Sequence, residues 1–245
     1  YILKYIFINF IIKFTNYKLS SSECFVVAGG DGFMLNTLKK YASYNKPFYG
    51  INCGSFGFLL NRYNNNDLVK KINRAKKTII NPLELSITSK NKKKRKLIAI
   101  NEVSLFRQSR QTALLKLSIG KKTIIKRLVG DGVLISTPAG STAYNLSVHG
   151  PILSLNSGKL AITPISPFRP RRWKGKIISK SSKVSVDNLD ATKRPVAAVA
   201  DNIEVRNVKT LSAKINNKYK LILLHDKERS LVKRIKIEQL RKNTT

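Results

Sequence analysis

Residues 24–42 read CFVVAGGDGFMLNTLKKYA and contain the three parts of a parallel α/β unit in order. The apolar run Cys24–Ala28 predicts a short strand, and the glycine-rich stretch 29–32 predicts a turn. From residue 33 to residue 42, apolar side chains recur at helical spacing. We therefore expect strand, turn and helix, with the turn at the carboxyl end of the strand.

The same order returns downstream, with a strand at 48–51, glycines in the turn at 54–57 and a helix over 66–76. Successive units of this kind predict a Rossmann-like α/β domain, which we place at residues 1–80. The apolar start, YILKYIFINFIIKF at 1–14, is too short to span a bilayer. We interpret it as a first strand of this domain rather than a signal peptide.

Beyond Pro82 the pattern becomes mostly β, so the predicted fold class is α/β plus all-β. We expect a larger β-sandwich-like domain over residues 81–227. A helix over 228–240 follows, which can pack back on the first domain. The strand-like stretches lie near 83–88, 97–106, 112–119, 122–128, 133–137, 160–166, 183–187, 196–200, 203–208 and 219–224.

Composition excludes several classes of protein. Hydrophobic residues make up 42% of the 245 residues, which argues against intrinsic disorder. No apolar run is long enough for a spanning helix. The two cysteines, Cys24 and Cys53, form neither a disulfide framework nor a zinc motif, so free thiols in the cytoplasm are expected.

The net charge is +34, from 47 Lys and Arg against 13 Asp and Glu. Such an excess is compatible with nucleic-acid binding. The lysines, however, are spread along the whole chain, and no RNP-like, zinc-finger or helix-turn-helix pattern accompanies them. We therefore expect no specific nucleic-acid partner and no membrane partner. A basic nucleic-acid-binding protein remains an alternative from another class.

Four of the few carboxylates, Asp31, Glu102, Asp131 and Asp201, stand at the ends of predicted strands. Glycines at 30 and 32 let backbone N–H groups face phosphate oxygens at a helix start. Asp31 can then orient a hydroxyl nucleophile or help to hold a metal ion. The alternative is that Asp31 only caps the helix.

The pair Asn101-Glu102 ends the run KLIAINE, and such a pair suits recognition of ribose hydroxyls. An edge-strand polar pair without a ligand is the alternative. Residues 130–153, GDGVLISTPAGSTAYNLSVHGPIL, join Asp131 and a strand to a hydroxyl-rich turn. In that turn Tyr144 offers a flat face for a base or ring, although a tyrosine in such a place often belongs to the core.

These segments together closely resemble the NAD kinase family. In order along the chain they are GGDG at 29–32, GINCGSFGFLL at 50–60, NEVSLFRQ at 101–108 and DGVLISTPAGSTAYNLSVHGPIL at 131–153. GGDG is shared with diacylglycerol-kinase-like lipid kinases, which are the competing enzyme class. The NE pair and TPAGSTAYN are far more specific to NAD kinases.

The resemblance implies phosphorylation of the 2′-hydroxyl of the adenosine ribose of NAD to give NADP. It implies ATP or polyphosphate as donor, a divalent cation such as Mg²⁺, and a homodimer or homotetramer. By the same resemblance, Asp31 matches the proton acceptor. The positions that match NAD-binding residues are Asp31, Gly32, Asn101, Glu102, Asp131, Ala139, Thr142, Ala143, Tyr144, Asn145, Leu146, Ser147 and Asp201.

Overall fold

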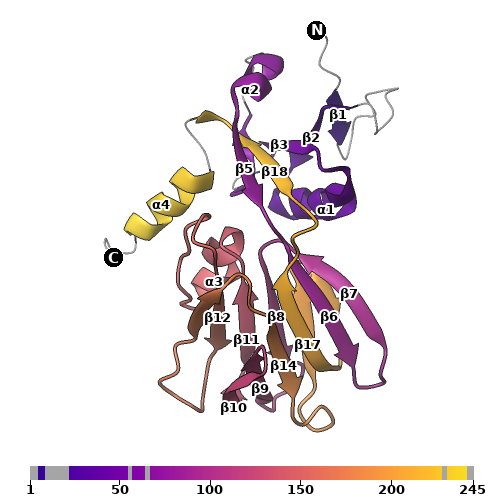
Figure 1. Ribbon diagram of the computed structural model, residues 1–245, viewed down its shortest axis with the longest axis vertical. Coiled ribbons are helices and arrows are strands. Elements are labelled where there is room, and N and C mark those ends of the chain that lie inside the picture. The colour runs from indigo at the N-terminus through magenta and orange to yellow at the C-terminus, as the bar shows by residue number, and fades with distance from the viewer. Residues whose placement is uncertain (1–4, 9–21, 55–56, 64–66, 228–230, 242–245) are drawn as a thin grey trace. The chain divides into compact units, whose positions relative to one another are not determined.

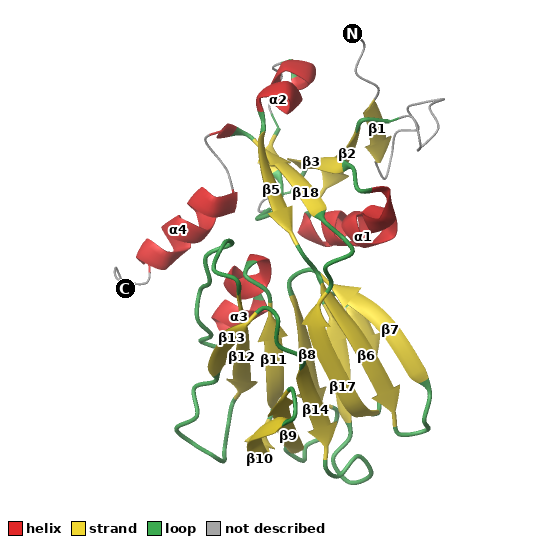
Figure 2. Cartoon of the chain, in the orientation of Figure 1, coloured by secondary structure: helices red, strands yellow, loops and turns green. Residues whose placement is uncertain are grey.

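The computed structural model describes residues 5–8, 22–54, 57–63, 67–227 and 231–241. The chain divides into two compact units (Figures 1 and 2). Unit 1 comprises Tyr1–Asn81 and Asn217–Thr245, and unit 2 comprises Pro82–Asn216.

Within the described residues, unit 1 contains a six-stranded sheet in the order β1-β2-β3-β18-β5, with β4 paired to β3. The pairs β1–β2, β2–β3, β3–β4 and β3–β18 are parallel, and β5 is antiparallel to β18. The strands are β1 (Tyr5–Ile8), β2 (Cys24–Gly29), β3 (Pro47–Asn52), β4 (Asn61–Arg62), β5 (Lys76–Ile80) and β18 (Leu221–His225).

The helices in the described part of unit 1 are α1 (Asp31–Tyr41), the short 3-10 helix η2 (Ala42–Tyr44), α2 (Leu68–Arg74) and α4 (Leu231–Arg241). Helix α1 buries Met34, Leu35 and Leu38, the apolar positions whose spacing predicted it. The strand and helix expected over 24–42 are confirmed. The helix expected over 66–76 is shorter, because Lys76 already begins β5, and residue 66 lies outside the described residues.

The two chain ends contribute to unit 1 as well. Of the strand expected within residues 1–14, the described part is β1, and the rest lies outside the described residues. The C-terminal limit of 227 for the β-rich domain was wrong. Leu221–His225 forms β18, which pairs with β3 and β5 in the unit 1 sheet. An apolar strand carries no local mark of the sheet that it joins, so its pattern alone could not assign it.

Unit 2 consists of two six-stranded antiparallel sheets, in the orders β10-β9-β14-β17-β6-β7 and β13-β12-β11-β8-β15-β16. The first sheet comprises β6 (Leu83–Ser89), β7 (Lys94–Ala99), β9 (Ala113–Ile119), β10 (Lys122–Gly130), β14 (Val184–Asn188) and β17 (Val208–Ile215). The second comprises β8 (Glu102–Arg107), β11 (Gly132–Ser136), β12 (Lys159–Ile165), β13 (Lys176–Ser179), β15 (Val196–Ala200) and β16 (Ile203–Val205).

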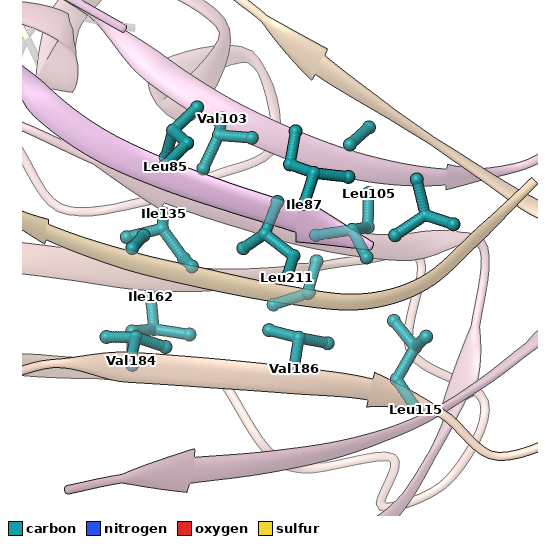
Figure 3. Packing of buried hydrophobic residues seen from close by; sticks show 14 of the residues in the cluster. Leu85, Ile87, Val103, Leu105, Leu115, Ile135, Ile162, Val184, Val186 and Leu211 are labelled. Carbon is teal, nitrogen blue, oxygen red and sulfur yellow. The ribbon is translucent and has the colours of Figure 1, made fainter. Parts of the chain in front are cut away.

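One buried cluster joins the two sheets of unit 2. Leu85, Ile87 and Leu211 of one sheet pack with Val103 and Ile135 of the other (Figure 3). Alternate residues of each strand therefore point inward, as in a β-sandwich. The predicted combination of an α/β part and a β-sandwich-like part is confirmed. Two short helices, η3 (Ala139–Thr142) and α3 (Tyr144–Ser147), follow β11.

His225, the last residue of β18, is fully buried. Neither ring nitrogen has a hydrogen-bond partner among the described residues. Burial, and then the positive charge of Arg234, lower the pKa of the imidazole from its usual 6.5 to about 4. The native state therefore holds His225 in its neutral form at pH 6, whereas an unfolded chain binds a proton there.

We expect unit 1 to lose stability as pH falls from about 6.5 to about 4, because the unfolded state binds the extra proton in this window. The loss should reach at most about 3 kcal/mol of unfolding free energy. Urea unfolding across this range should show a weaker pH dependence in His225→Leu. His149→Asn, at an exposed residue, is the control and should keep the dependence. If the unfolding free energy depended equally on pH in the wild type, His225→Leu and His149→Asn, the lowered pKa of His225 would not be its cause.

Candidate functional site

Asp31 is the first residue of α1, directly after the glycine turn. The N-cap residue is Gly30, which has no side chain with which to cap the helix. Instead, the Asp31 carboxylate accepts the backbone N–H of Phe58 at Oδ2 (2.5 Å) and that of Leu59 at Oδ1 (2.9 Å). The alternative in which Asp31 caps α1 is therefore wrong. The residue holds a segment that follows β3, while Gly30 and Gly32 beside it are exposed.

In unit 2, Asp201 holds the turn that carries Asn101-Glu102. Its Oδ1 accepts the N–H of Asn101 at 2.8 Å and that of Glu102 at 3.3 Å, and its Oδ2 accepts that of Ile100 at 2.9 Å. Asp201 has a φ of 53°, a left-handed conformation that Asp and Asn tolerate better than most residues. The Asp201 carboxylate therefore binds the backbone N–H groups of Asn101 and Glu102 and fixes the turn from which their side chains extend.

The hydroxyl-rich turn after β11 packs directly on this pair. Thr137 donates its N–H to the carbonyl of Asn101 (2.9 Å) and its hydroxyl to that of Ile100 (2.7 Å). A Cβ at Gly140 would lie 2.2 Å from the Asn101 carbonyl oxygen, so only glycine permits this approach. The turn after β11 and the Asn101-Glu102 pair are far apart in the sequence, but their backbones are in direct contact in the fold.

A cavity of about 420 Å³, to which Glu102 and Tyr144 contribute, lies beside this contact. On β8, Val103 and Leu105 enter the sandwich core, so the intervening residues face the other way. The cavity is lined by Glu102, Ser104, Phe106, Tyr144, Val199 and Asp201. It therefore combines a buried carboxylate with the faces of two exposed aromatic rings.

Tyr144 begins α3 and is 38% exposed. Partial burial, and then the negative charges of Asp131 and Glu102, raise the pKa of its phenol above the usual 10. The hydroxyl therefore stays protonated and can donate a hydrogen bond. The alternative in which Tyr144 is a core residue is wrong, because its side chain lines the cavity.

Asp131, between β10 and β11, forms an ion pair with Arg107, at 2.6 Å from Oδ1 to Nε. The Arg107 N–H also donates to the Asp131 carbonyl at 2.9 Å. Arg107 additionally donates from Nη1 to the carbonyl of Ser109 at 2.7 Å. Our sequence reasoning missed Arg107 as a site residue. The available signal was a basic residue at the end of the NEVSLFR strand.

The remaining predicted positions lie on η3, α3 and the residue between them. Ala139 is buried, Thr142, Ala143 and Leu146 are half-buried, and Ser147 is exposed. Asn145 is fully buried: its amide donates to the carbonyls of Ser141 (3.2 Å) and Pro151 (2.9 Å) and accepts the Thr163 hydroxyl (2.7 Å). Its side chain therefore holds the loop from inside.

Two further features concern ligands and membranes. Among the described residues, no group of three or more His, Cys, Asp or Glu side chains gathers to hold a metal ion. None of the helices in the described part of the chain is both long and apolar enough to cross a membrane.

Comparison with known proteins gives close relatives over most of the chain. An NAD kinase of Caulobacter vibrioides is 47% identical over 219 residues, which cover 89% of this chain and 84% of the relative. The chain belongs to the NAD kinase family. A second NAD kinase, of Xanthomonas oryzae pv. oryzae, is 43% identical over 93% of this chain and 89% of its own length. Residues 100–220 match the ATP-NAD kinase C-terminal domain.

Solved structures of this family share the fold. Yeast NADH kinase complexed with NADH aligns with a TM-score of 0.80 and 24% identity, over 91% of this chain and 67% of that one. An NAD kinase from Archaeoglobus fulgidus in complex with ATP aligns with a TM-score of 0.71 and 23% identity, over 86% and 81%. The NAD kinase fold is thus conserved at low sequence identity.

We expect Asp201→Asn to lower the unfolding free energy of unit 2 by about 1–3 kcal/mol, since an amide NH₂ then faces backbone N–H donors. Glu204→Gln removes an exposed carboxylate nearby and should change stability by less than about 0.5 kcal/mol. Chemical unfolding of both variants checks this. Equal unfolding free energies of Asp201→Asn and Glu204→Gln would show that Asp201 does not hold the turn.

Proposed function

We propose that this NAD kinase transfers a phosphoryl group from ATP to the 2′-hydroxyl of the adenosine ribose of NAD, giving NADP. The enzyme is then a phosphotransferase with an alcohol group as acceptor. NAD kinase activity itself follows from membership of the family. The observation that carries the proposal is that Glu102 and Tyr144, from two separate motifs, line one cavity together with Asp201, which holds the backbone of Asn101 and Glu102.

The cavity of unit 2 offers the groups that a nucleoside needs. The Glu102 carboxylate can accept hydrogen bonds from ribose hydroxyls, and the Asn101 amide can donate or accept. The ring of Tyr144 offers a face for stacking on a base, and its protonated hydroxyl offers a donor. We propose that Asp131, Ala139, Thr142, Ala143, Leu146 and Ser147 complete the NAD site. Asn145 and Asp201 then act by holding the backbone of their loops.

We propose that Asp31 accepts the proton of the 2′-hydroxyl as that oxygen attacks the terminal phosphorus of ATP. The bond from that phosphorus to the bridging oxygen breaks, and ADP leaves with the electron pair. A positioned carboxylate contributes about 10²–10⁴ to the rate of such a step. The exposed backbone at Gly30 and Gly32, at the start of α1, can bind donor phosphates.

A divalent cation such as Mg²⁺ fits the Asp31 carboxylate together with phosphates bound at the glycine turn, because Mg²⁺ commonly binds through one or two carboxylates and substrate phosphates. Asp31 uses one lone pair on each oxygen for Phe58 and Leu59, and each oxygen retains another. When bound, the cation neutralises charge on the donor phosphates. Asp31 is therefore the residue that we propose as its protein ligand.

We propose polyphosphate as a second phosphoryl donor, whose phosphates the glycine turn 29–32 can bind. We propose a homodimer or homotetramer in the cytoplasm, with no specific nucleic-acid or membrane partner. The two free cysteines agree with a reducing compartment.

The purified protein should form NADP from NAD, ATP and Mg²⁺, and an NADP-specific dehydrogenase assay can measure the product. Polyphosphate in place of ATP tests the second donor, and omission of Mg²⁺ with EDTA tests the cation. Absence of NADP with every donor would contradict the proposed reaction.

We expect Asp31→Asn to lower turnover by about 10²–10⁴. It should also lower the melting temperature, because the amide NH₂ opposes one of the two N–H groups that the carboxylate now accepts. Asp67→Asn is a matched control: Asp67 also accepts two backbone N–H groups, from Val69 and Lys70, at the start of α2. The control should retain turnover. Normal turnover in Asp31→Asn, measured well below its melting temperature, would remove Asp31 from the mechanism.

A further inference from the structure

The segment 57–60 of unit 1 lies between two charged side chains of opposite sign. On one side, the Asp31 carboxylate accepts the N–H groups of Phe58 and Leu59. On the other, Arg234 of α4 donates from Nη1 to the carbonyls of Gly57 (3.1 Å) and Phe58, and from Nη2 to that of Leu60 (2.7 Å). The guanidinium thus binds three carbonyls within four residues.

These hydrogen bonds meet on the same two peptide groups. The carbonyl of Gly57 and the N–H of Phe58 belong to one peptide group, and the carbonyl of Phe58 and the N–H of Leu59 belong to the next. Each group therefore accepts a hydrogen bond from Arg234 at its oxygen and donates one to Asp31 at its nitrogen. Hydrogen bonds in such a chain polarise and strengthen one another. A positive and a negative side chain are thereby coupled through the backbone.

We propose that Arg234 is a positioning residue for Asp31, acting through the peptide groups 57–58 and 58–59. The inference rests on the proposed role of Asp31 and extends it to the C-terminal helix. The planar guanidinium suits this task, because its fixed donors can reach several carbonyls at once. It fixes the orientation of the two N–H groups, and these fix the orientation of the carboxylate. The sequence around Asp31 does not point to Arg234, since 203 positions separate the two residues.

Helix α4 has buried apolar residues of its own, so Arg234 is not its only means of attachment. Leu231 and Ile235 are 0% and 2% exposed. Lys236, on the same helix, is exposed and provides a matched control for the loss of one positive charge. The effect of Arg234 on the segment can therefore be separated from the effect of charge on the helix.

A double-mutant cycle measures the coupling without any substrate. We compare melting temperatures of the full-length wild type, Asp31→Asn, Arg234→Gln and the double variant. The loss in the double variant should be smaller than the sum of the single losses, because either change interrupts the same chain of hydrogen bonds. The same cycle with Lys236→Ala in place of Arg234→Gln should be additive. Additivity in both cycles would overturn the proposal.

Steady-state kinetics tests the positioning role itself. Arg234→Gln should lower kcat by about 10-fold to 100-fold, the scale of a misplaced catalytic group, with KM for NAD within about twofold of wild type. Lys236→Ala should match the wild type, and Arg234→Lys should fall between wild type and Arg234→Gln. A kcat of Arg234→Gln equal to that of Lys236→Ala would overturn the proposal.

Two further outcomes keep the test decisive. If Arg234→Gln does not fold, Arg234→Lys replaces it in both measurements, with reduced kcat and non-additivity still required. If the wild type forms no NADP, the proposed function fails, whereas the melting cycle still decides whether Asp31 and Arg234 are coupled. Backbone amide NMR adds a direct readout: the N–H protons of Phe58 and Leu59 should shift in Arg234→Gln and stay unchanged in Lys236→Ala.

Discussion

Hydrogen bonds from backbone N–H groups to half-buried carboxylates organise the candidate residues within each unit. Asp31 binds the segment after β3, and Asp201 binds the turn between β7 and β8. A charged acceptor makes such hydrogen bonds stronger than neutral pairs, so the turns are well defined without regular secondary structure. In a chain with only 13 acidic residues against 47 basic ones, these two carboxylates serve the geometry of the backbone.

The β-sandwich supplies the base on which the cavity of unit 2 depends. Because side chains alternate along β8, the strand that puts Val103 and Leu105 into the core also presents Glu102, Ser104 and Phe106 on the opposite face. The core therefore fixes the spacing of the cavity residues. Gly140 completes the arrangement, since its missing side chain lets the loop after β11 touch the backbone of Asn101.

The charge of the protein suits its proposed ligands. NAD and ATP are both anionic, and a net charge of +34 favours their approach at low ionic strength. Individual groups respond to their surroundings: burial, and then the charges of Asp131 and Glu102, raise the pKa of the Tyr144 phenol, whereas burial, and then the charge of Arg234, lower the pKa of His225. The net charge therefore bears on the attraction of anionic ligands, whereas burial and neighbouring charges decide the protonation of these two side chains.

Local pattern was sufficient for much of this protein. Hydrophobic spacing over 24–42 predicted β2 and α1, and alternation after Pro82 predicted most strands of the sandwich. The motifs around Asp31, Asn101-Glu102 and 130–153 indicated the family. The short strands β4, β5 and β13 were missed, because each has too few buried positions to show a period. The longer strand β17 was also missed, since only its first residue, Val208, fell within the predicted stretch 203–208.

Partners that are distant in the chain were decided only by tertiary structure. The sheet that β18 joins, the backbone turn that Asp201 holds, the inward direction of Asn145 and the contact of Arg234 with the segment 57–60 all belong here. Asp201 binds a turn 99 to 101 positions away, and Arg234 binds carbonyls 174 to 177 positions away. A sequence pattern records which groups can form hydrogen bonds, whereas their pairing depends on the packing that brings them within reach.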